Sequence, residues 1–183
     1  MSTSTALRAR VVYESMFGNS RWVAQAVGVG LRQQGFDVSV VDVRDASHGD
    51  DHDLLVLGAP THAFSLSRAS TRQDAVRQGA SPDCATVGLR EWIAALPAPT
   101  GNGRLVAVFD TRVRKVKHLP GGASRKAAHL LTKKDFELVV SPQSFMVEDV
   151  AGPLSEDQLE LATQWGRRVA IETQDRLAAA SVR

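Results

Sequence analysis

The segment Glu14–Ser20, with the sequence ESMFGNS, has the residue types that bind a phosphate group. Two hydroxyl residues, Ser15 and Ser20, lie on either side of Gly18, and apolar residues with helical spacing follow. The first turn of a helix has free backbone N–H groups and the positive end of the helix dipole, which together attract anions. We therefore expect a terminal phosphate to bind here, although a plain helix start, with Ser20 as its cap and Ser15 in a turn, also fits. The candidate residues are Ser15, Met16, Phe17, Gly18, Asn19 and Ser20.

The spacing of residues in the chain does not match other known phosphate-binding or catalytic motifs. The chain has no Gly-x-x-x-x-Gly-Lys-Ser/Thr loop, which argues against a P-loop ATPase. Gly28 and Gly30 match two glycines of the dinucleotide fingerprint, but Gln33 takes the position of the third. The histidines lack metal-ligand spacing, and neither a Ser-His-Asp nor a Cys-His arrangement can be assigned. We expect no metal and no catalytic side chain.

Short apolar strands alternate with amphipathic helices along the chain. Strands are predicted at residues 11–13, 36–43, 53–59, 105–109 and 136–140, the fourth after a turn at Gly101–Gly103. Helices are predicted from Ser20 to Gly35, over 70–78, over 89–96, from Gly121 to Leu131, and from a capping box at Ser155 and Gln158 onward. This alternation predicts a doubly wound α/β fold with helices on both faces. In such folds the ligand binds beyond the carboxyl ends of the strands, so the loops after strands one, three and four are the candidates.

Composition favours one domain over residues 1–183, with frayed ends at 1–6 and 178–183. The chain is 43% hydrophobic and carries a formal charge of +2, which fits a folded domain with a sizeable core. Its one cysteine, Cys84, excludes an intrachain disulfide and indicates the reducing cytoplasm. No signal peptide and no apolar run of about 20 residues is present, so we expect no membrane partner.

Tyr13–Ser20 resembles the FMN phosphate loop of flavodoxins, whose pattern is Thr/Ser-x-Thr-Gly-x-Thr. It is closer to the Ser-Met-aromatic-Gly-Asn/Ser-Thr variant in the flavodoxin modules of flavodiiron proteins. Gly58–Phe64 is similar to the segment that lines the ribityl chain and one face of the flavin, and Gly121–Ser124 resembles the entry to the next helix. Phe109–Arg112 stands where flavodoxins place the loop over the other side of the ring.

The resemblance spans roughly residues 8–175 and implies FMN as cofactor and a five-stranded parallel sheet of order 2-1-3-4-5. Beyond the phosphate loop it implies that FMN contacts Pro60, Thr61, His62, Ala63, Phe64, Asp110, Thr111 and Arg112. Two features depart from the family pattern. Phe17 replaces the middle hydroxyl, and neither flavin loop contains the Trp or Tyr that many flavodoxins stack on the ring, which leaves His62 and Phe64 as aromatic candidates.

A basic segment follows the fourth strand. Eight Lys and Arg residues and no acid lie between Arg112 and Lys134, which leaves −6 for the rest of the chain. Either this segment is a solvated face, or it attracts an acidic redox partner or the phosphates of NAD(P)H. No nucleic-acid-binding motif accompanies it, so we expect no nucleic acid partner.

Three functions are consistent with these features. The first is an FMN-binding, flavodoxin-like electron-transfer protein, in which the flavin does the chemistry. The second is an NAD(P)H-dependent reductase of a quinone or small molecule. The third is a binding module that kept the fold and lost FMN.

Overall fold

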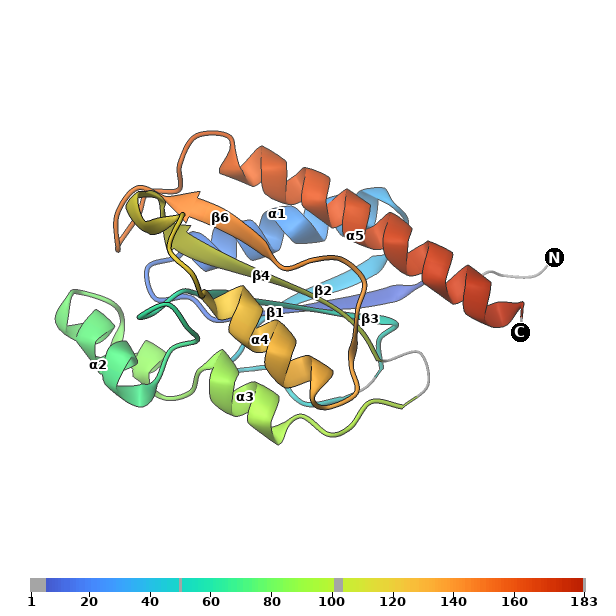
Figure 1. The fold of residues 1–183 in the computed structure, drawn as a ribbon, viewed down its shortest axis with the longest axis horizontal. Coiled ribbons are helices and arrows are strands. Elements are labelled where there is room, and N and C mark those ends of the chain that lie inside the picture. Colours follow the sequence, from blue (N-terminus) through green and yellow to red (C-terminus); the bar gives the residue numbers. More distant parts are fainter. Residues whose placement is uncertain (1–5, 50, 101–103, 183) are drawn as a thin grey trace.

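The computed structural model describes residues 6–49, 51–100 and 104–182, and within them one parallel sheet forms the centre of the molecule (Figure 1). Its strands are β1 (Arg8–Tyr13), β2 (Asp37–Asp42), β3 (Leu54–Pro60), β4 (Leu105–Val113), β5 (Glu137–Leu138) and β6 (Gln143–Val147). The strand order is β2-β1-β3-β4-β5, and β6 also pairs with β4. All these pairings are parallel. The predicted order is therefore confirmed, with the fifth position divided between two short strands.

Helices cover both faces of the sheet. They are α1 (Asn19–Gln33), α2 (Ala69–Arg77), α3 (Leu89–Ala95), α4 (Ala123–Thr132) and α5 (Gln158–Ser181), with 3-10 turns η1 (Pro82–Ala85) and η3 (Arg114–Val116). Figure 1 shows α1 and α5 on one face and α3 and α4 on the other, with α2 at one end of the sheet. This arrangement confirms the doubly wound α/β fold.

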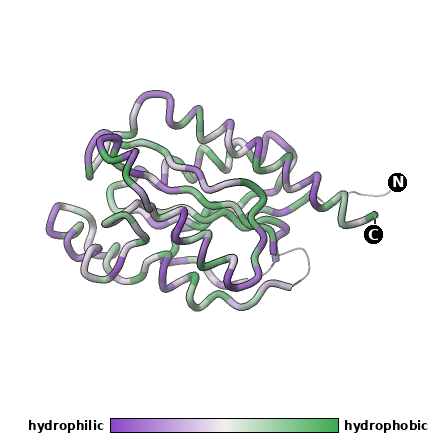
Figure 2. The backbone as a smooth tube through the Cα atoms, viewed as in Figure 1, coloured by the Kyte–Doolittle hydropathy of each residue, from purple (hydrophilic) through white to green (hydrophobic). Residues whose placement is uncertain are grey.

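The strands are apolar along their length because both faces of the sheet are buried. Leu54 to Leu57 of β3 are fully inaccessible to solvent. Figure 2 shows this hydrophobic centre, and helices with more hydrophilic outer surfaces surround it. On the α1 and α5 side, the rings of Phe109, Phe145 and Trp165 meet edge to face.

Three predicted strand boundaries are wrong. β1 begins at Arg8 and not at residue 11, because it pairs with β2 from Arg8 onward. β4 continues past Phe109 to Val113, because β6 pairs with its second half from Phe109 to Val113. The predicted strand 136–140 forms a ladder only at Glu137–Leu138, and the chain then returns to β4 as β6. β6 escaped prediction because its first residues, Gln143 and Ser144, are polar.

The predicted capping box of the last helix is also wrong. α5 begins at Gln158, and its cap residue is Asp157 with a φ of 62°. Ser155 instead accepts a hydrogen bond from Arg114 Nε, at 3.1 Å. The Gln158 Oε1 accepts one from the Met146 N–H, at 2.8 Å, so the Gln158 side chain joins the start of α5 to β6.

Two of the sequence predictions, the turn before the fourth strand and the frayed chain ends, concern residues at or beyond the limits of the described ranges. The turn at Gly101–Gly103 and residues 1–5 and 183 lie outside the described residues. The expected frayed end at 178–183 overlaps α5, which continues to Ser181. No helix within the described ranges has both the length and the apolar character that a bilayer span requires.

Candidate functional site

A cavity of about 230 Å³ lies at the carboxyl ends of β1, β3 and β4, where the topology predicts a ligand. All predicted site residues except Gly18, Phe64 and Asp110 line it. These are Ser15, Met16, Phe17, Asn19, Ser20, Pro60, Thr61, His62, Ala63, Thr111 and Arg112. Three loops that are far apart in the sequence therefore form one site.

The loop at residues 15–20 presents the start of α1 to this cavity. Gly18 is the cap residue, with a φ of 91° that favours glycine. The Ser15 Oγ accepts hydrogen bonds from the N–H groups of Gly18, at 3.1 Å, and Arg21, at 3.3 Å. Among the described residues, no acceptor pairs with the N–H groups of Asn19 and Ser20. These two donors remain available for an anion.

Ser20 is not the helix cap that the alternative interpretation required. Its hydroxyl lies 2.8 Å from the hydroxyl of Thr111 on β4, and both residues are buried. Because each hydroxyl has one hydrogen and only one lies between the two oxygens, the pair retains one O–H that can donate to a ligand.

The loop after β3 forms a tight hairpin beside the cavity. His62 and Ser65 exchange backbone hydrogen bonds, and Ala63 and Phe64 have φ values of 46° and 61°. This left-handed backbone is costly for residues other than glycine. The Phe64 carbonyl accepts the Gly122 N–H at 2.8 Å, which fixes the hairpin against the loop before α4. The Phe64 side chain is 48% exposed and lies outside the cavity lining.

Thr61 joins the same hairpin to α4. Its Oγ1 accepts the Ala123 N–H at 2.9 Å and so satisfies one free donor at the start of that helix. The hydroxyl hydrogen of Thr61 stays available to the cavity.

Asp110, Thr111 and Arg112 lie within β4 and not in a loop, which corrects the prediction for this segment. The Asp110 Oδ2 accepts hydrogen bonds from the Ser124 N–H, at 2.9 Å, and from its hydroxyl, at 2.7 Å. Asp110 is therefore fully buried at the start of α4 and does not line the cavity.

Arg112 does line the cavity, and its side chain organises the loop that follows β4. Its Nη atoms donate to the carbonyls of Gly121, Val116 and Leu119 at 3.0–3.2 Å. Its buried Nε has no hydrogen-bond partner within residues that the structure describes. A buried guanidinium with one unused donor beside a cavity favours a ligand that has an acceptor or a negative charge there.

The profile of the Flavodoxin family matches residues 11–80, which include the loop at residues 15–20 and the hairpin after β3. The same fold is found in solved flavodoxins. The chain has a flavodoxin-like fold.

Solved structures agree with this flavodoxin-like fold over nearly the whole chain. A flavodoxin from the domain Archaea superposes with a TM-score of 0.64 at 17% identity, covering 92% of this chain and 99% of the flavodoxin. Flavodoxin 1 from Bacillus cereus gives 0.62 at 17% identity, covering 88% and 96%.

The rubredoxin:oxygen oxidoreductase of Desulfovibrio gigas gives a TM-score of 0.64 at 16% identity. The match covers 93% of the flavodoxin-like chain but only 37% of that larger enzyme. Among curated proteins, no sequence matches this chain.

The sequence did not reveal that α2 lines one side of the site in this flavodoxin-like protein. Thr71, Asp74, Ala75 and Gln78 contribute to the cavity, as do Val113, Val147 and Val150. The helix itself was predicted, but its place depends on a tertiary contact in which Ala75 packs with Met16, Ala80 and Cys84. Nothing in the spacing of residues 60–88 encodes that contact.

The surroundings of two titratable side chains beside the loop at residues 15–20 favour their neutral forms. Burial, together with the charge of Arg72, lowers the pKa of His62, which lines the cavity. Burial raises the pKa of Cys84, whose thiol donates to the Ser15 carbonyl at 3.4 Å. Within the described part of the chain, no cluster of His, Cys, Asp or Glu is suited to a metal ion.

Proposed function

We propose that this flavodoxin-like protein binds FMN in the cavity and transfers electrons to and from a partner protein. The observation that carries the proposal is the convergence of the phosphate-binding loop, the hairpin after β3 and the end of β4 on one cavity. The family match and the fold support the same ligand.

The residues at the cavity fit FMN. The free N–H groups of Asn19 and Ser20, the helix dipole of α1 and the hydroxyl pair of Ser20 and Thr111 suit a phosphate monoester. The Thr61 hydroxyl and the Arg112 Nε supply donors for the oxygens and nitrogens of the rest of the molecule. The volume of about 230 Å³ is below the ~300–1,000 Å³ of pockets that enclose ligands. A flavin would thus be partly exposed, as electron transfer to a partner requires.

FMN would supply reversible transfer of one or two electrons, and no side chain of the chain needs to act as a catalyst. The residues of the protein bind and orient the cofactor. A buried guanidinium at Arg112 stabilises negative charge in the cavity, because the interaction is screened less there than in water. Arg112 would therefore favour a reduced, anionic ligand over a neutral one.

We expect Ser20→Ala to weaken FMN binding about ten- to a hundredfold. A hydrogen bond to a charged phosphate contributes ~1.5–3 kcal/mol, and this substitution removes a hydroxyl from the pair with Thr111. The measurement is a fluorescence titration of the apoprotein with FMN. Thr111→Ser keeps both hydroxyls and serves as the control. Wild-type affinity within twofold in both Ser20→Ala and Thr111→Val would refute a phosphate site at this pair.

The loop after β4 suits an acidic partner protein. Lys115 and Lys117 lie in or next to η3, close in sequence to Leu119, whose side chain is 47% exposed. Arg114 is already engaged, since its Nε contacts Glu148 at 3.2 Å and Ser155 at 3.1 Å. Lys115 and Lys117 make no ion pair with any residue that the structure describes. Exposed apolar area with a charged rim is typical of protein interfaces.

Replacing Lys115 and Lys117 together by Gln should slow association with the electron partner and leave FMN affinity unchanged. Positive charges accelerate encounter with an acidic surface, and salt screens them over ~8 Å at physiological ionic strength. Stopped-flow measurement of FMN reoxidation by the partner over a salt series tests this. The control is Arg125→Gln on α4. Rates that do not depend on salt, or a double variant as fast as the wild type at low salt, would show that the partner docks elsewhere.

A further inference from the structure

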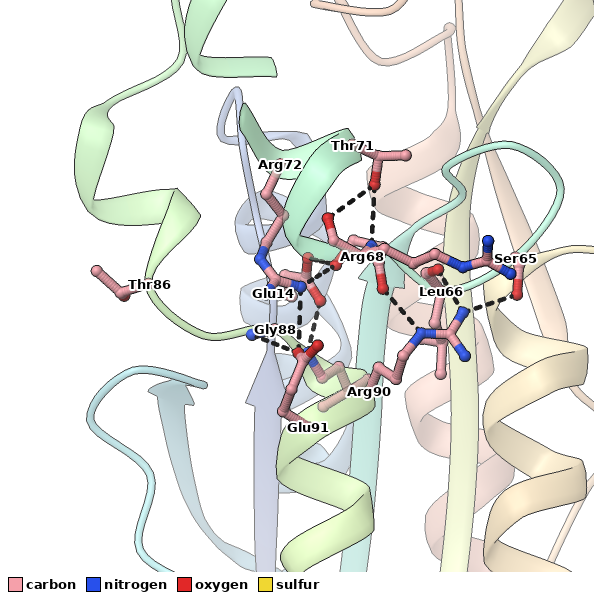
Figure 3. Close-up of polar contacts among 12 residues, drawn as sticks. Glu14, Ser65, Leu66, Arg68, Thr71, Arg72, Thr86, Gly88, Arg90 and Glu91 are labelled. Carbon is pink, nitrogen blue, oxygen red and sulfur yellow. Dashed lines mark hydrogen bonds and ion pairs between the residues drawn. The ribbon is translucent and has the colours of Figure 1, made fainter. Parts of the chain in front are cut away.

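A buried carboxyl group lies immediately before the phosphate-binding loop. Glu14 follows β1, directly precedes Ser15, and is only 2% exposed. Its Oε1 accepts a short hydrogen bond from the Ser67 hydroxyl, and its Oε2 accepts the Leu89 N–H at 2.6 Å. Figure 3 shows the carboxyl enclosed between β1 and the segments that carry α2 and α3.

A single arginine, Arg72, lies between the carboxyl groups of Glu14 and Glu91 and offsets part of their negative charge. Arg72 of α2 is 2% exposed, and its Nη1 donates to the Ser67 Oγ at 3.0 Å and to the Glu91 Oε2 at 3.1 Å (Figure 3). Arg72 pairs with Glu91 and reaches Glu14 only through Ser67. With all three groups ionised, Glu14, Glu91 and Arg72 together carry one excess negative charge, and of the three only Glu91 has an exposed side chain.

In the described structure, the other charged groups near Glu14 make no hydrogen bond with its carboxyl group. Arg90 of α3 donates to the carbonyls of Ser67 and Leu66 and to the Ser65 hydroxyl (Figure 3). Cys84 of η1 lies on the same side of the loop, and burial raises the pKa of its thiol, which keeps it neutral. Asp42, the last residue of β2, and Arg44 form an ion pair at 2.8 Å and so compensate each other. Burial also raises the pKa of Glu14, against the opposing effects of Ser67, Leu89 and Arg72.

We propose that Glu14 takes up a proton from solvent when the phosphate of FMN binds, so that FMN binding is coupled to pH through this residue. The inference rests on the proposed function. Phosphate would bring up to two negative charges to the loop that begins at the next residue, Ser15, which lines the cavity. Two like charges in a buried site favour the neutral form of the carboxyl group. Protonated at Oε1, Glu14 would donate to the Ser67 Oγ and leave Arg72 paired with Glu91.

The sign of the effect follows from this linkage. Below the pKa of Glu14 in the free protein, the carboxyl is already neutral and FMN binds without proton uptake. Between that pKa and the higher pKa of Glu14 in the complex, binding takes up a proton, so affinity falls as pH rises, by up to about tenfold per pH unit. Above the second pKa the affinity no longer changes through Glu14. The second ionisation of FMN phosphate, near pH ~6, is a property of the ligand and affects all variants equally.

The experiment measures Kd for FMN and for riboflavin, which has no phosphate, from about pH 5 to 8 in wild type and in Glu14→Gln. Calorimetry in two buffers of different ionisation enthalpy counts the protons taken up. We expect the ratio of the wild-type Kd to the Glu14→Gln Kd for FMN to rise with pH, and proton uptake to be larger in the wild type. The same ratio for riboflavin should stay constant.

Equal pH profiles of the two proteins for FMN would overturn the proposal, as would the same Glu14-dependent slope with riboflavin. If Glu14→Gln does not fold, Ser67→Ala replaces it. Loss of a donor to the carboxylate raises the pKa of Glu14 further, so the fall in FMN affinity should move to higher pH, and an unmoved profile counts against the role of Glu14. Absence of any FMN binding at every pH would refute the proposed function, and this inference with it.

Discussion

Gly58→Ala is expected to destabilise the fold by about 3 kcal/mol, because the ring of Phe109 covers this glycine. A Cβ at position 58 would lie 1.9 Å from the Phe109 Cζ and 2.4 Å from two further ring atoms. The ring is 1% exposed and packs against Phe145 and Trp165, so it cannot move without disturbing the core. Overpacking of a core costs ~1–3 kcal/mol or more. Thermal unfolding should show a Tm lower by roughly 6–12 °C.

A smaller residue at position 109 should restore part of this loss. In the double variant Gly58→Ala with Phe109→Leu, the two changes are expected to be less than additive, since the clash is removed. Gly49→Ala is the matched control, because a Cβ there would meet its nearest atom at 3.6 Å, an ordinary contact. A Gly58→Ala protein with the same Tm as the wild type would contradict the packing described for β3 and β4.

Asn19→Asp is expected to weaken FMN binding at least a hundredfold and to make the free protein slightly more stable than the wild type. Asn19 lies in the first turn of α1 and lines the cavity. A carboxylate there would occupy the anion site and repel the phosphate, with a Coulomb energy of ~4 kcal/mol at 4 Å for an effective dielectric constant of about 20. At a helix N-terminus the same charge stabilises the fold by ~0.3–1 kcal/mol.

The opposite signs of these two effects make the Asn19→Asp test specific. Binding is measured by FMN titration, and stability by thermal unfolding without FMN. Asn19→Ala is the control for the loss of the amide, which donates to the Ala151 carbonyl at 3.2 Å. If Asn19→Asp binds FMN as tightly as Asn19→Ala does, the phosphate does not bind at the start of α1.

The local patterns in the sequence predict much of this architecture. Continuous apolar runs such as Leu54–Leu57 predict buried parallel strands, and the loop Ser15–Ser20 predicts an anion site at a helix start. Features that depend on contacts distant in sequence are not predicted. The extension of β4 through Asp110–Arg112 depends on pairing with β6, and the wall that α2 contributes depends on the packing of Ala75 against Met16.

The hydrogen-bond partners of polar side chains also cannot be predicted from local sequence patterns. Ser15, and not Ser20, accepts hydrogen bonds from N–H groups at the start of α1, those of Gly18 and Arg21, because Ser20 pairs with Thr111, 91 positions away. Glu14 looks in the sequence like a solvated loop residue, yet the structure buries it beneath α2 and α3. Its partners, Ser67, Arg72 and Leu89, are more than 50 residues further along the chain, so only the folded structure reveals the cluster.

Titration of the apoprotein with FMN, followed by visible absorbance and by quenching of flavin fluorescence, tests the central claim most directly. We expect saturation at one FMN per chain with a Kd of ~1 µM or below, and much weaker binding of riboflavin because the phosphate site then stays unfilled. No spectral change at FMN concentrations of about 100 µM, or riboflavin binding as tight as that of FMN, would contradict an FMN site built on the loop from Ser15 to Ser20.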